Sequence, residues 1–296
     1  MKVLVTGATG FVGPKIVHAL RARGHDVRAL VRRPERAKTL RAWGCELAEG
    51  DMTDAGSLRR AVDGCGVVVH VVAVIRGSAS DFDRVMVGGT ESLIGAAKEA
   101  GVGRFVLMSA LGTNERNREL VPYFRSKWAM EQALAGSGLE RVVFRPSFVF
   151  GRDGGVLPMF VRQVRLAPLT PIVGSGSTRL QPIWVEDVGQ FFAQAVDAPA
   201  AAGRTFEIGG PEAVTWNDFY ARVKRVLGVR RGTVHLPVGV VRAGAAVVEH
   251  LPRAPITRDQ LKMLTEGGDN VCDNGPALAV FDVDLVGLDE QIRRAS

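Results

Sequence analysis

The sequence predicts an α/β fold: a doubly wound parallel sheet with a small, mostly helical cap toward the C-terminus. Over the first 150 residues, short apolar runs rich in β-branched residues alternate with helical patterns. Beyond residue 151 the pattern loosens into loops rich in glycine and proline. Alternating strands and helices are typical of parallel strands joined by right-handed crossovers. The length of 296 residues allows about two domains of ~150 residues each.

The alternation predicts six strands in the first half of the chain. The predicted strands are residues 3–5, 26–31, 45–48, 66–71, 104–108 and 141–144. The predicted helices are residues 12–23, 34–43, 55–62, 85–100 and 120–134. The fourth strand is apolar on both faces, as expected for a buried parallel strand. Further on, we expect residues 183–196 and 205–208 to form a helix and a strand that return to the sheet.

The composition argues against several classes of protein. The net charge is +7, but the longest basic runs are pairs and aromatic residues make up only 6% of the chain, so we expect no nucleic-acid partner. The three cysteines, Cys45, Cys65 and Cys272, form neither a disulfide framework nor a zinc motif, so we expect no metal site.

The sequence also carries no segment that we expect to target or span a membrane. The central apolar stretch, residues 67–75, is interrupted by His70 and falls far short of the ~20 residues that a bilayer requires. Gly7 and Gly10 break the apolar N-terminal segment, so we expect no secretory signal. These observations predict a cytoplasmic protein.

A glycine-rich loop follows the first predicted strand directly. Residues 6–13 read Thr-Gly-Ala-Thr-Gly-Phe-Val-Gly and lead into an amphipathic helix. Glycines at such a turn permit a tight bend, close approach of a diphosphate and close packing of helix on strand, while the helix dipole faces the phosphates. The spacing alone is weak evidence, and an ordinary turn is the alternative. The position after a strand and before a helix favours a dinucleotide-binding loop.

The end of the second predicted strand bears on the choice of nicotinamide cofactor. An acidic residue at this place bonds the ribose hydroxyls of NAD, but here the strand ends in Arg32 and Arg33 with no carboxylate. An arginine there can clamp a 2′-phosphate by charge-assisted hydrogen bonds. We therefore expect NADP(H) in preference to NAD(H), with NAD(H) still open. The alternative is two solvated arginines before Pro34.

The pair Tyr123 and Lys127 is the candidate catalytic machinery. The two residues are four apart in a predicted helix, which places both side chains on one face. A nearby ammonium favours the phenolate, so Tyr123 could exchange a proton with a substrate oxygen while hydride moves at the adjacent carbon. The alternative is a surface pair on a helix anchored by Phe124 and Trp128.

The glycine spacing and the Tyr/Lys pair resemble those of the extended and atypical branches of the short-chain dehydrogenase/reductase superfamily. In addition, residues 145–151 resemble the Arg-Pro-x-x-Val-Tyr/Phe-Gly segment that lines the nicotinamide. The resemblance implies a Rossmann domain over residues 1–150, completed by about 177–210, with residues 151–176 and 211–296 as a substrate-binding cap. It implies that the cofactor contacts Gly7, Thr9, Gly10, Phe11, Val12, Gly13, Arg32, Arg33, Asp51, Met52, Val72, Ala73, Ser109, Tyr123, Lys127, Pro146, Ser147 and Phe148.

The resemblance also implies a serine at the end of the fifth strand that supports the tyrosine. Aligned with extended members, the active position falls on Ala110, and Ser109 stands one residue early. Either Ser109 takes the catalytic role through a local shift, or the chain has lost part of its machinery and keeps the cofactor for another purpose.

Two later segments narrow the resemblance. Residues 182–188 match a Pro-x-x-Val-x-Asp-Val segment, in which we interpret Asp187 as a structural residue at a helix start. Residues 256–264 and 269–271 resemble the tail of bacterial relatives of the NADPH-binding accessory subunit of respiratory complex I. That subgroup includes structural, cofactor-loaded members and members that act in or near quinone biosynthesis. We expect the tail itself to carry no chemistry.

Two further patterns have mainly structural interpretations. We expect the apolar helix 238–248, interrupted by Arg242, to pack within the cap or against another subunit in preference to a membrane surface. His70, in the fourth strand, is expected to be a hydrogen-bonded histidine of the core or cofactor loop rather than a metal ligand.

The sequence therefore predicts an oxidoreductase that moves hydride between NADP(H) and a carbonyl, alcohol or sugar-nucleotide substrate, with Tyr123, Lys127 and Ser109 as catalytic residues. A non-catalytic NADPH-binding scaffold or assembly protein is the alternative. A small-molecule substrate is expected, and its identity is not encoded in these motifs. Peripheral membrane contact, association with a respiratory complex and a homodimer are left open.

Overall fold

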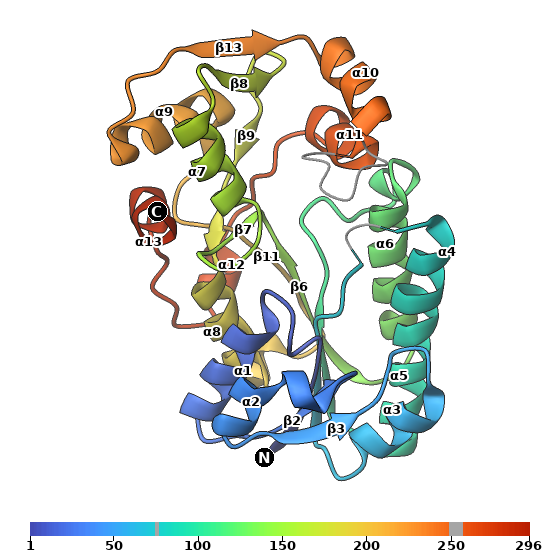
Figure 1. The fold of residues 1–296 in the computed structure, drawn as a ribbon. Coiled ribbons are helices and arrows are strands. Elements are labelled where there is room, and N and C mark those ends of the chain that lie inside the picture. Colours follow the sequence, from blue (N-terminus) through green and yellow to red (C-terminus); the bar gives the residue numbers. More distant parts are fainter. Residues whose placement is uncertain (75–76, 249–256) are drawn as a thin grey trace.

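A parallel seven-stranded sheet forms the centre of the molecule, in the order β11-β6-β5-β4-β1-β2-β3. The computed structural model describes residues 1–74, 77–248 and 257–296. The strands of the sheet are β1 Lys2–Thr6, β2 Asp26–Val31, β3 Glu46–Glu49, β4 Val67–His70, β5 Arg104–Met108, β6 Glu140–Pro146 and β11 Thr205–Ile208. This architecture confirms the predicted doubly wound sheet, including the late strand that returns to it (Figure 1).

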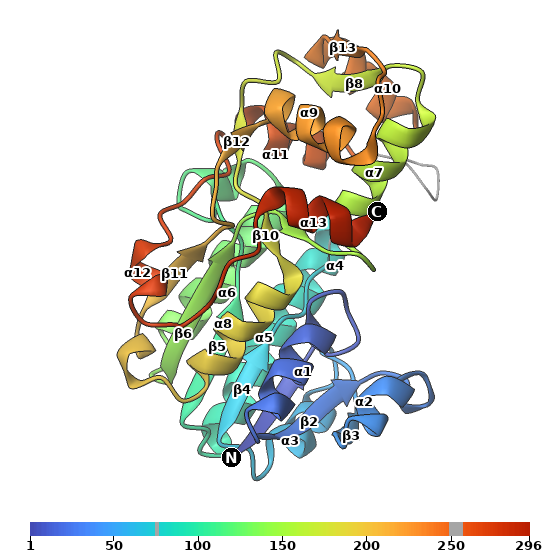
Figure 2. The same ribbon diagram turned by 90° about the vertical axis from the view of Figure 1, so that its left-hand side faces the viewer.

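Helices cover both faces of the sheet (Figures 1 and 2). One face carries α1 Gly13–Ala22, α2 Lys38–Ala42 and α8 Val185–Ala195; the other carries α3 Ala55–Val62, α5 Gly89–Glu99 and α6 Pro122–Ala135. Along β1, Val3 and Val5 pack on the first face and Leu4 packs on the second. This alternation follows from the two-residue period of a strand, and it explains why the strands are apolar throughout.

Several helices differ from their predicted bounds. The predicted helix 34–43 is a 3₁₀ turn, Pro34–Arg36, followed by α2. The predicted helix 85–100 begins earlier, as α4 Ala79–Asp81 and a π-helical segment Phe82–Gly88 that runs into α5. Short 3₁₀ turns also occupy Asn117–Glu119 and Pro199–Ala201.

The predicted helix 183–196 starts two residues late, because Ile183 and Trp184 form a short strand, β10. β10 pairs in parallel with β7, Val149–Phe150. The helix α8 then begins at Val185. Asp187 lies in its first turn, and its Oδ2 accepts a hydrogen bond of 2.9 Å from the backbone N–H of Val286. This contact supports the structural role expected for Asp187, and burial raises the pKa of its carboxyl to about 6.

A smaller layer stands over the carboxyl ends of the strands (Figure 1). Its helices are α7 Leu157–Leu166, α9 Trp216–Leu227, α10 Val238–Val248, α11 Arg258–Glu266 and α13 Leu288–Ala295. Its strands pair as β8 Thr170–Val173 with β13 Thr233–Leu236, and as β9 Arg179–Leu180 with β12 Val214–Thr215. Trp216, Phe219 and Phe160 pack edge-to-face in its core. Within the described chain, no helix combines the length and apolar character needed to cross a bilayer.

The C-terminal segment returns from the cap to the sheet. After α11 it passes β9, forms α12 Gly275–Leu278 beside β11, and then leads to α13 in the cap (Figure 2). The side chain of Gln194 on α8 both donates to and accepts from the backbone of Asp282. Residues Ala277 and Phe281 therefore belong to the core of the sheet. The division of the chain into two domains stays a prediction. Of the tail segment 256–264 that the sequence singled out, Ile256 lies outside the described residues.

Phe281 fixes this returning segment by aromatic packing. Its ring is 1% exposed and lies 5.4 Å from the ring of Phe144, 5.8 Å from that of Phe191 and 5.1 Å from that of Phe206 (centroid distances). These three rings come from β6, α8 and β11. A residue far along the chain thus completes the hydrophobic layer between sheet and helix.

We predict that Phe281→Ala lowers the free energy of unfolding by about 3–5 kcal/mol, because it removes a buried aromatic ring and leaves a cavity. Leu278→Ala is the matched control, since Leu278 lies three residues earlier and is 42% exposed. We expect this control to stay within about 0.5 kcal/mol of the original protein. Urea unfolding followed by circular dichroism measures both, and equal losses would contradict the packing role of Phe281.

Candidate nucleotide and catalytic site

The predicted site residues gather at the carboxyl edge of the sheet. Because all seven strands are parallel, β1, β2, β4, β5 and β6 end at the same edge. The turns that follow these strands carry the predicted glycines, arginines, Val72, Ser109 and the segment around Ser147. β1 lies between β2 and β4, where the winding of the sheet reverses. Dinucleotides bind at this switch point in open α/β sheets.

Side chains at Gly7 and Gly13, in the loop after β1, would collide with the neighbouring backbone. Gly7 has a φ of +76°, and a Cβ there would lie 3.0 Å from the backbone of Val71 and Val72. A Cβ on Gly13 would lie 2.7 Å from the Cα of Ala8. The N–H of Gly10 donates to the carbonyl of Gly7 at 3.0 Å, which closes the turn. The loop is therefore drawn tightly against the end of β4 and against the start of α1.

The first turn of α1 offers unpaired backbone donors to an anion. Its N-cap residue, Val12, makes no side-chain cap, and the turn contains no acidic residue. A hollow of about 170 Å³ lies beside it, lined by Gly10, Phe11, Pro14, Lys15, Arg152, Asp153 and Val185. An uncapped helix N-terminus behind a close-packed glycine turn suits the diphosphate of a dinucleotide.

Phe11 has a packing role that the glycine motif did not reveal. A Cβ on Gly151 would lie 2.8 Å from its ring, and a Cβ on Gly155 would lie 2.9 Å from it. The ring of Phe11 is thus enclosed by the loop that follows β7. The available signal was glycine at residues 151, 154 and 155. Gly151 was interpreted as the end of the nicotinamide-lining motif and the other two as loop residues.

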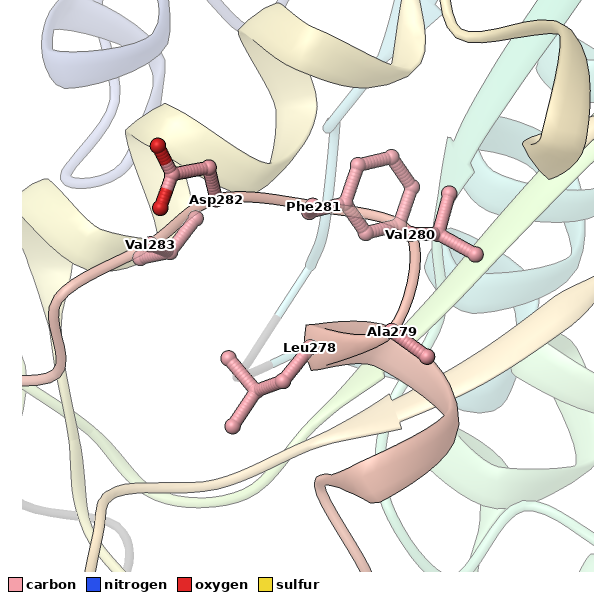
Figure 3. Close-up of a pocket in the computed structure, with 6 residues that line it drawn as sticks. All are labelled: Leu278, Ala279, Val280, Phe281, Asp282 and Val283. Carbon is pink, nitrogen blue, oxygen red and sulfur yellow. The ribbon is translucent and has the colours of Figure 1, made fainter.

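A larger hollow, of about 400 Å³, lies away from these residues. It is lined by Leu278, Ala279, Val280, Phe281, Asp282 and Val283, which belong to one turn of the returning segment (Figure 3). None of the predicted site residues contributes to it. Its walls come from the end of α12 and the turn after it, so it reflects the path of the segment around Phe281.

The predicted adenosine end of the site lies where β2 and β3 end side by side. The N–H of Gly50 donates to the carbonyl of Val31 at 3.1 Å, which brings Arg32 close to Asp51. Oδ1 of Asp51 accepts hydrogen bonds from the backbone and hydroxyl of Thr53, and these bonds, aided by the charges of Arg32 and Arg84, lower the pKa of the Asp51 carboxyl. Met52 is buried against Gly89.

The side chains of Arg32 and Arg33 are exposed, and in the described chain they have no hydrogen-bond or ion-pair partner. Two guanidinium groups are thus free to bind the 2′-phosphate of NADP(H).

Val72 is half-buried and Ala73 exposed in the segment after β4. The predicted residues of the adenosine side therefore lie along one edge, and their roles stay a prediction.

His70 at the end of β4 is a hydrogen-bonded core residue, as expected. Its Nδ1 lies 2.6 Å from the hydroxyl of Thr6, and its Nε2 lies 3.0 Å from the hydroxyl of Thr90. Thr90 donates its own proton to the carbonyl of Met86, so Nε2 carries the proton of a neutral ring and Nδ1 accepts from Thr6. Burial and the nearby charge of Lys127 lower the pKa of His70 to about 3.

Tyr123 and Lys127 lie on one face of α6, as predicted. Lys127 is 1% exposed, and its Nζ donates to the backbone carbonyl of Met108 at 2.7 Å. Nζ lies 5.9 Å from the centroid of the Tyr123 ring. Among the described residues the hydroxyl of Tyr123 has no hydrogen-bond partner. α6 therefore holds an ammonium group and an unengaged phenol next to each other at the end of β5.

Burial controls the protonation of this pair. It raises the pKa of Tyr123 to about 12 and lowers the pKa of Lys127 to about 8, the latter opposed by the carboxylate of Glu131. The expectation that Lys127 favours the phenolate stays a prediction, because burial dominates the pKa of Tyr123. Desolvation of the phenol outweighs an ammonium that is directed toward Met108. Tyr123 is a protonated phenol at neutral pH and can donate a proton.

Ser109 is buried at the end of β5, with 1% of its surface exposed. Its backbone N–H donates to Phe144, and its hydroxyl donates to the hydroxyl of Thr113 at 3.3 Å. Thr113 is equally buried, and sequence reasoning did not select it because it lies beyond the expected serine position. The structure therefore offers a pair of hydroxyls here, and the catalytic role of Ser109 stays a prediction.

A buried ion pair connects α6 with β6, the strand that leads to the segment predicted to line the nicotinamide. Arg145 on β6 binds both carboxylate oxygens of Glu131, at 3.0 Å through Nε and 2.7 Å through Nη2. Glu131 is 6% exposed and lies four residues after Lys127. Glu207 lies 3.7 Å from the same guanidinium and adds to the negative charge around it. This bidentate pair fixes the register of α6 against β6.

The segment after β6 is held by a residue from the distant C-terminal tail. The Oδ1 of Asn270 accepts from the Ser147 hydroxyl at 2.6 Å and from the Phe148 N–H at 3.1 Å. The backbone of Asn270 lies beside β9: its N–H donates to the carbonyl of Arg179, and its carbonyl accepts from the N–H of Gln181. Pro146 and Ser147 are buried, and Phe148 is half-buried. The expectation that this tail carries no chemistry overlooked its role in shaping the site.

A scan against protein-family models decides the family. The model described as NAD(P)H-binding matches residues 7–199. The chain belongs to this NAD(P)H-binding family. Its relatives identify it as an extended short-chain dehydrogenase/reductase-like protein, as the sequence motifs suggested.

Three relatives illustrate the range of this family. Ceramide reductase of Caulobacter vibrioides is 31% identical over 83% of this chain and 77% of its own length. A 4-hydroxy-2-methyl-3-oxo-4-farnesyl-3,4-dihydroquinoline-1-oxide ketoreductase of Stigmatella aurantiaca is 28% identical over 86% of this chain and 81% of its own. The mouse mitochondrial NADH dehydrogenase [ubiquinone] 1 alpha subcomplex subunit 9 is 32% identical over 70% of this chain and 56% of its own.

The solved structures agree with the sequence relatives. The crystal structure of gox2253 superposes with a TM-score of 0.81 at 25% identity, and the match covers 99% of this chain and 96% of that one. Family and fold together make the chain an NAD(P)-binding oxidoreductase of the short-chain dehydrogenase/reductase superfamily.

We predict that Asn270→Leu lowers the free energy of unfolding by about 1–3 kcal/mol, because it leaves the Ser147 hydroxyl and the Phe148 N–H without an acceptor. It also accelerates hydrogen exchange at the Phe148 amide. Asn270→Asp, which keeps an acceptor oxygen in place, is expected to retain the slow exchange. Amide exchange followed by mass spectrometry or NMR checks this, and unchanged protection in Asn270→Leu would show that Asn270 does not hold the segment.

Proposed function

We propose that the protein is an NADP(H)-dependent reductase that adds hydride to the carbonyl carbon of a small molecule. The observation that carries this proposal is the unengaged, protonated hydroxyl of Tyr123 beside the buried ammonium of Lys127. A protonated phenol suits the donation of a proton to a carbonyl oxygen, which is the reductive direction.

The glycine loop, the uncapped start of α1 and the arginines after β2 are the residues that would hold the cofactor. When bound, its reduced nicotinamide supplies a hydride to the substrate carbon. Tyr123 gives its proton to the carbonyl oxygen, so that one hydride and one proton convert a carbonyl to an alcohol. Lys127, held at Met108, stabilises the negative charge that Tyr123 gains and so eases this transfer. Solvent then returns a proton to Tyr123.

The substrate that we propose is an apolar ketone of limited water solubility. The names of two relatives specify a ceramide and a farnesylated dihydroquinoline oxide, both with long hydrocarbon parts. The wall beside the proposed nicotinamide position is consistent with this class, because Phe148 packs edge-to-face on Trp216 of the cap. Sugar nucleotides are the less favoured alternative, since they need polar groups in place of such aromatic surfaces.

A non-catalytic cofactor-binding role in a larger assembly is the second candidate. It is favoured by Ala110 at the usual serine position and by the similarity to a named subunit of NADH dehydrogenase. In that case the cofactor would stabilise the fold, and Tyr123 and Lys127 would serve only to hold it. The two candidates differ in whether Tyr123 is needed for turnover.

We predict that Tyr123→Phe lowers kcat for ketone reduction by about 10²–10⁴-fold while NADPH binding persists, because a positioned general acid contributes about this much. Tyr220→Phe makes the same chemical change in the cap, where the hydroxyl of Tyr220 donates to Gln163, and serves as the matched control. NADPH consumption with a panel of apolar ketones and quinones measures turnover. Full activity in Tyr123→Phe, or no turnover with any member of the panel, would favour the scaffold.

We predict that Arg32→Ala weakens NADPH binding by about 10–100-fold and leaves NADH binding nearly unchanged, since only NADPH carries the 2′-phosphate that a charged hydrogen bond would hold. Arg36→Ala removes an exposed arginine four residues later and is the control. Fluorescence titration with both cofactors gives the two ratios. Equal losses of NADPH and NADH affinity in Arg32→Ala would overturn the proposed NADP(H) preference.

A further inference from the structure

Two segments of the cap carry basic residues and no acidic residue. No basic run is longer than a pair, yet residues 154–185 and 219–248 contain no acidic residue at all. The basic residues of these two segments are Arg162, Arg165, Arg179, Arg222, Lys224, Arg225, Arg230, Arg231 and Arg242. These nine positive charges exceed the net charge of the entire chain, +7. The two segments are therefore basic locally, although the cap as a whole, residues 151–176 and 211–296, has 14 basic and 12 acidic residues.

Only some of these nine basic residues pair with a carboxylate. Four of the nine form ion pairs with carboxylates from outside the two segments: Arg179 with Asp269, Arg222 with Glu212, Arg225 with Asp289 and Arg242 with Glu266. In the described chain the other five have no carboxylate partner: Arg162, Arg165, Lys224, Arg230 and Arg231. Arg162, Arg165, Arg230 and Arg231 are also exposed.

Apolar side chains are exposed at the same end. Leu166 is 66% exposed and Leu169 49% exposed, in the loop that joins α7 to β8. Their loop lies against the loop before β13: Arg231 donates to the carbonyl of Arg165 at 2.6 Å, and Thr170 donates to the carbonyl of Gly232 at 2.9 Å. Val240, 61% exposed at the start of α10, follows β13.

We call the exposed residues of α7, of the loop after it, of the loop before β13 and of the start of α10 the outer cap surface: Arg162, Arg165, Leu166, Leu169, Arg230, Arg231 and Val240. β8 and β13 lie side by side at the end of the molecule farthest from the N-terminus, and this surface is built on them (Figures 1 and 2). The arrangement mixes exposed aliphatic residues with arginines that nothing in the described chain neutralises. Such a surface keeps its apolar side chains in water unless a partner covers them.

We propose that the outer cap surface docks on a lipid bilayer that contains anionic phospholipid. Arginines bind the phosphate headgroups, and leucines between them enter the boundary with the acyl chains, as in proteins that lie on a membrane without crossing it. Nucleic acid would match the charge but not the exposed leucines, and its single strands require aromatic rings that this surface lacks. The binding is peripheral, because it uses loops and the first turn of α10.

The position of this surface suits the proposed function without depending on it. The cap stands over the carboxyl edge of the sheet, so docking by its outer end would place the cap between the lipid and the site (Figure 1). Docking would bring the protein to the bilayer in which an apolar ketone is concentrated. Membrane binding can nevertheless fail while reductase activity holds, and the reverse, so the two proposals are tested separately.

The test is sedimentation of the full-length protein with vesicles. The protein is expected to sediment with vesicles of phosphatidylglycerol mixed with phosphatidylcholine, to stay in solution with phosphatidylcholine alone, and to be released by salt. The triple variant Arg162→Glu, Arg165→Glu, Arg230→Glu is expected to bind about 100-fold more weakly, at about fivefold for each basic residue removed. Leu166→Ser with Leu169→Ser is expected to weaken binding and to leave less of it resistant to salt.

The matched control makes the same change of charge at the opposite end of the molecule. Lys38→Glu, Arg41→Glu, Arg60→Glu alters three exposed residues on α2 and α3 and is expected to keep vesicle binding within a few-fold. All replaced residues except Leu166 and Leu169 are charged surface groups, and thermal unfolding with bound NADPH checks that each variant is folded. The proposal is wrong if the original protein does not bind anionic vesicles, or if the control variant loses as much vesicle binding as the cap variant. It is also wrong if the protein binds duplex DNA but not vesicles.

Discussion

The contact between the first turn of the chain and the end of β4 is the constraint on which the site depends. Gly7 can approach Val71 and Val72 only because it lacks a Cβ and adopts a positive φ. That approach brings the start of α1 down onto the sheet at the point where the winding reverses. Every other group of the site is positioned relative to this edge, because the strands that carry them are parallel and end together.

Polar contacts also fix α6, which carries the proposed catalytic residues, against the sheet. Lys127 is tied to the end of β5 through the carbonyl of Met108, and one turn further along α6 Glu131 is tied to Arg145 on β6. The helix is therefore held at two positions, one turn apart, against the adjacent strands β5 and β6. These two contacts hold the backbone of α6 at the end of the sheet, and the helix carries Tyr123 there.

The fold could be predicted from the sequence largely because its signals are local. Two-residue and helical periods, together with glycines at strand ends, mark the strands and crossovers of the Rossmann half. The site residues could be placed at one edge for the same reason. The cap strands β8 and β13 were missed, because each is short and pairs with a segment about sixty residues away. The bounds of the helix before α5 were missed because a π-helical turn leaves no pattern in the sequence.

What sequence reasoning could not supply is contact between remote segments. The role of Asn270 depends on a chain that leaves the cap and passes the end of β6, and nothing near residue 270 indicates that path. Likewise, the raised pKa of Tyr123 results from burial, whereas the spacing of Tyr123 and Lys127 alone suggested the opposite direction. The basic surface at the end of the cap could not be predicted, because it depends on two acid-free segments that the pairing of β8 with β13 brings side by side.

The returning segment also sets an order of events during synthesis. Phe281 closes an aromatic cluster whose other members, Phe144, Phe191 and Phe206, are made 75 or more residues earlier. Until that residue leaves the ribosome, the nascent sheet presents an unfilled apolar patch between β6 and α8. Chains stalled before this point would be natural clients for chaperones, because the half of the protein that looks independent in the sequence lacks its final ring.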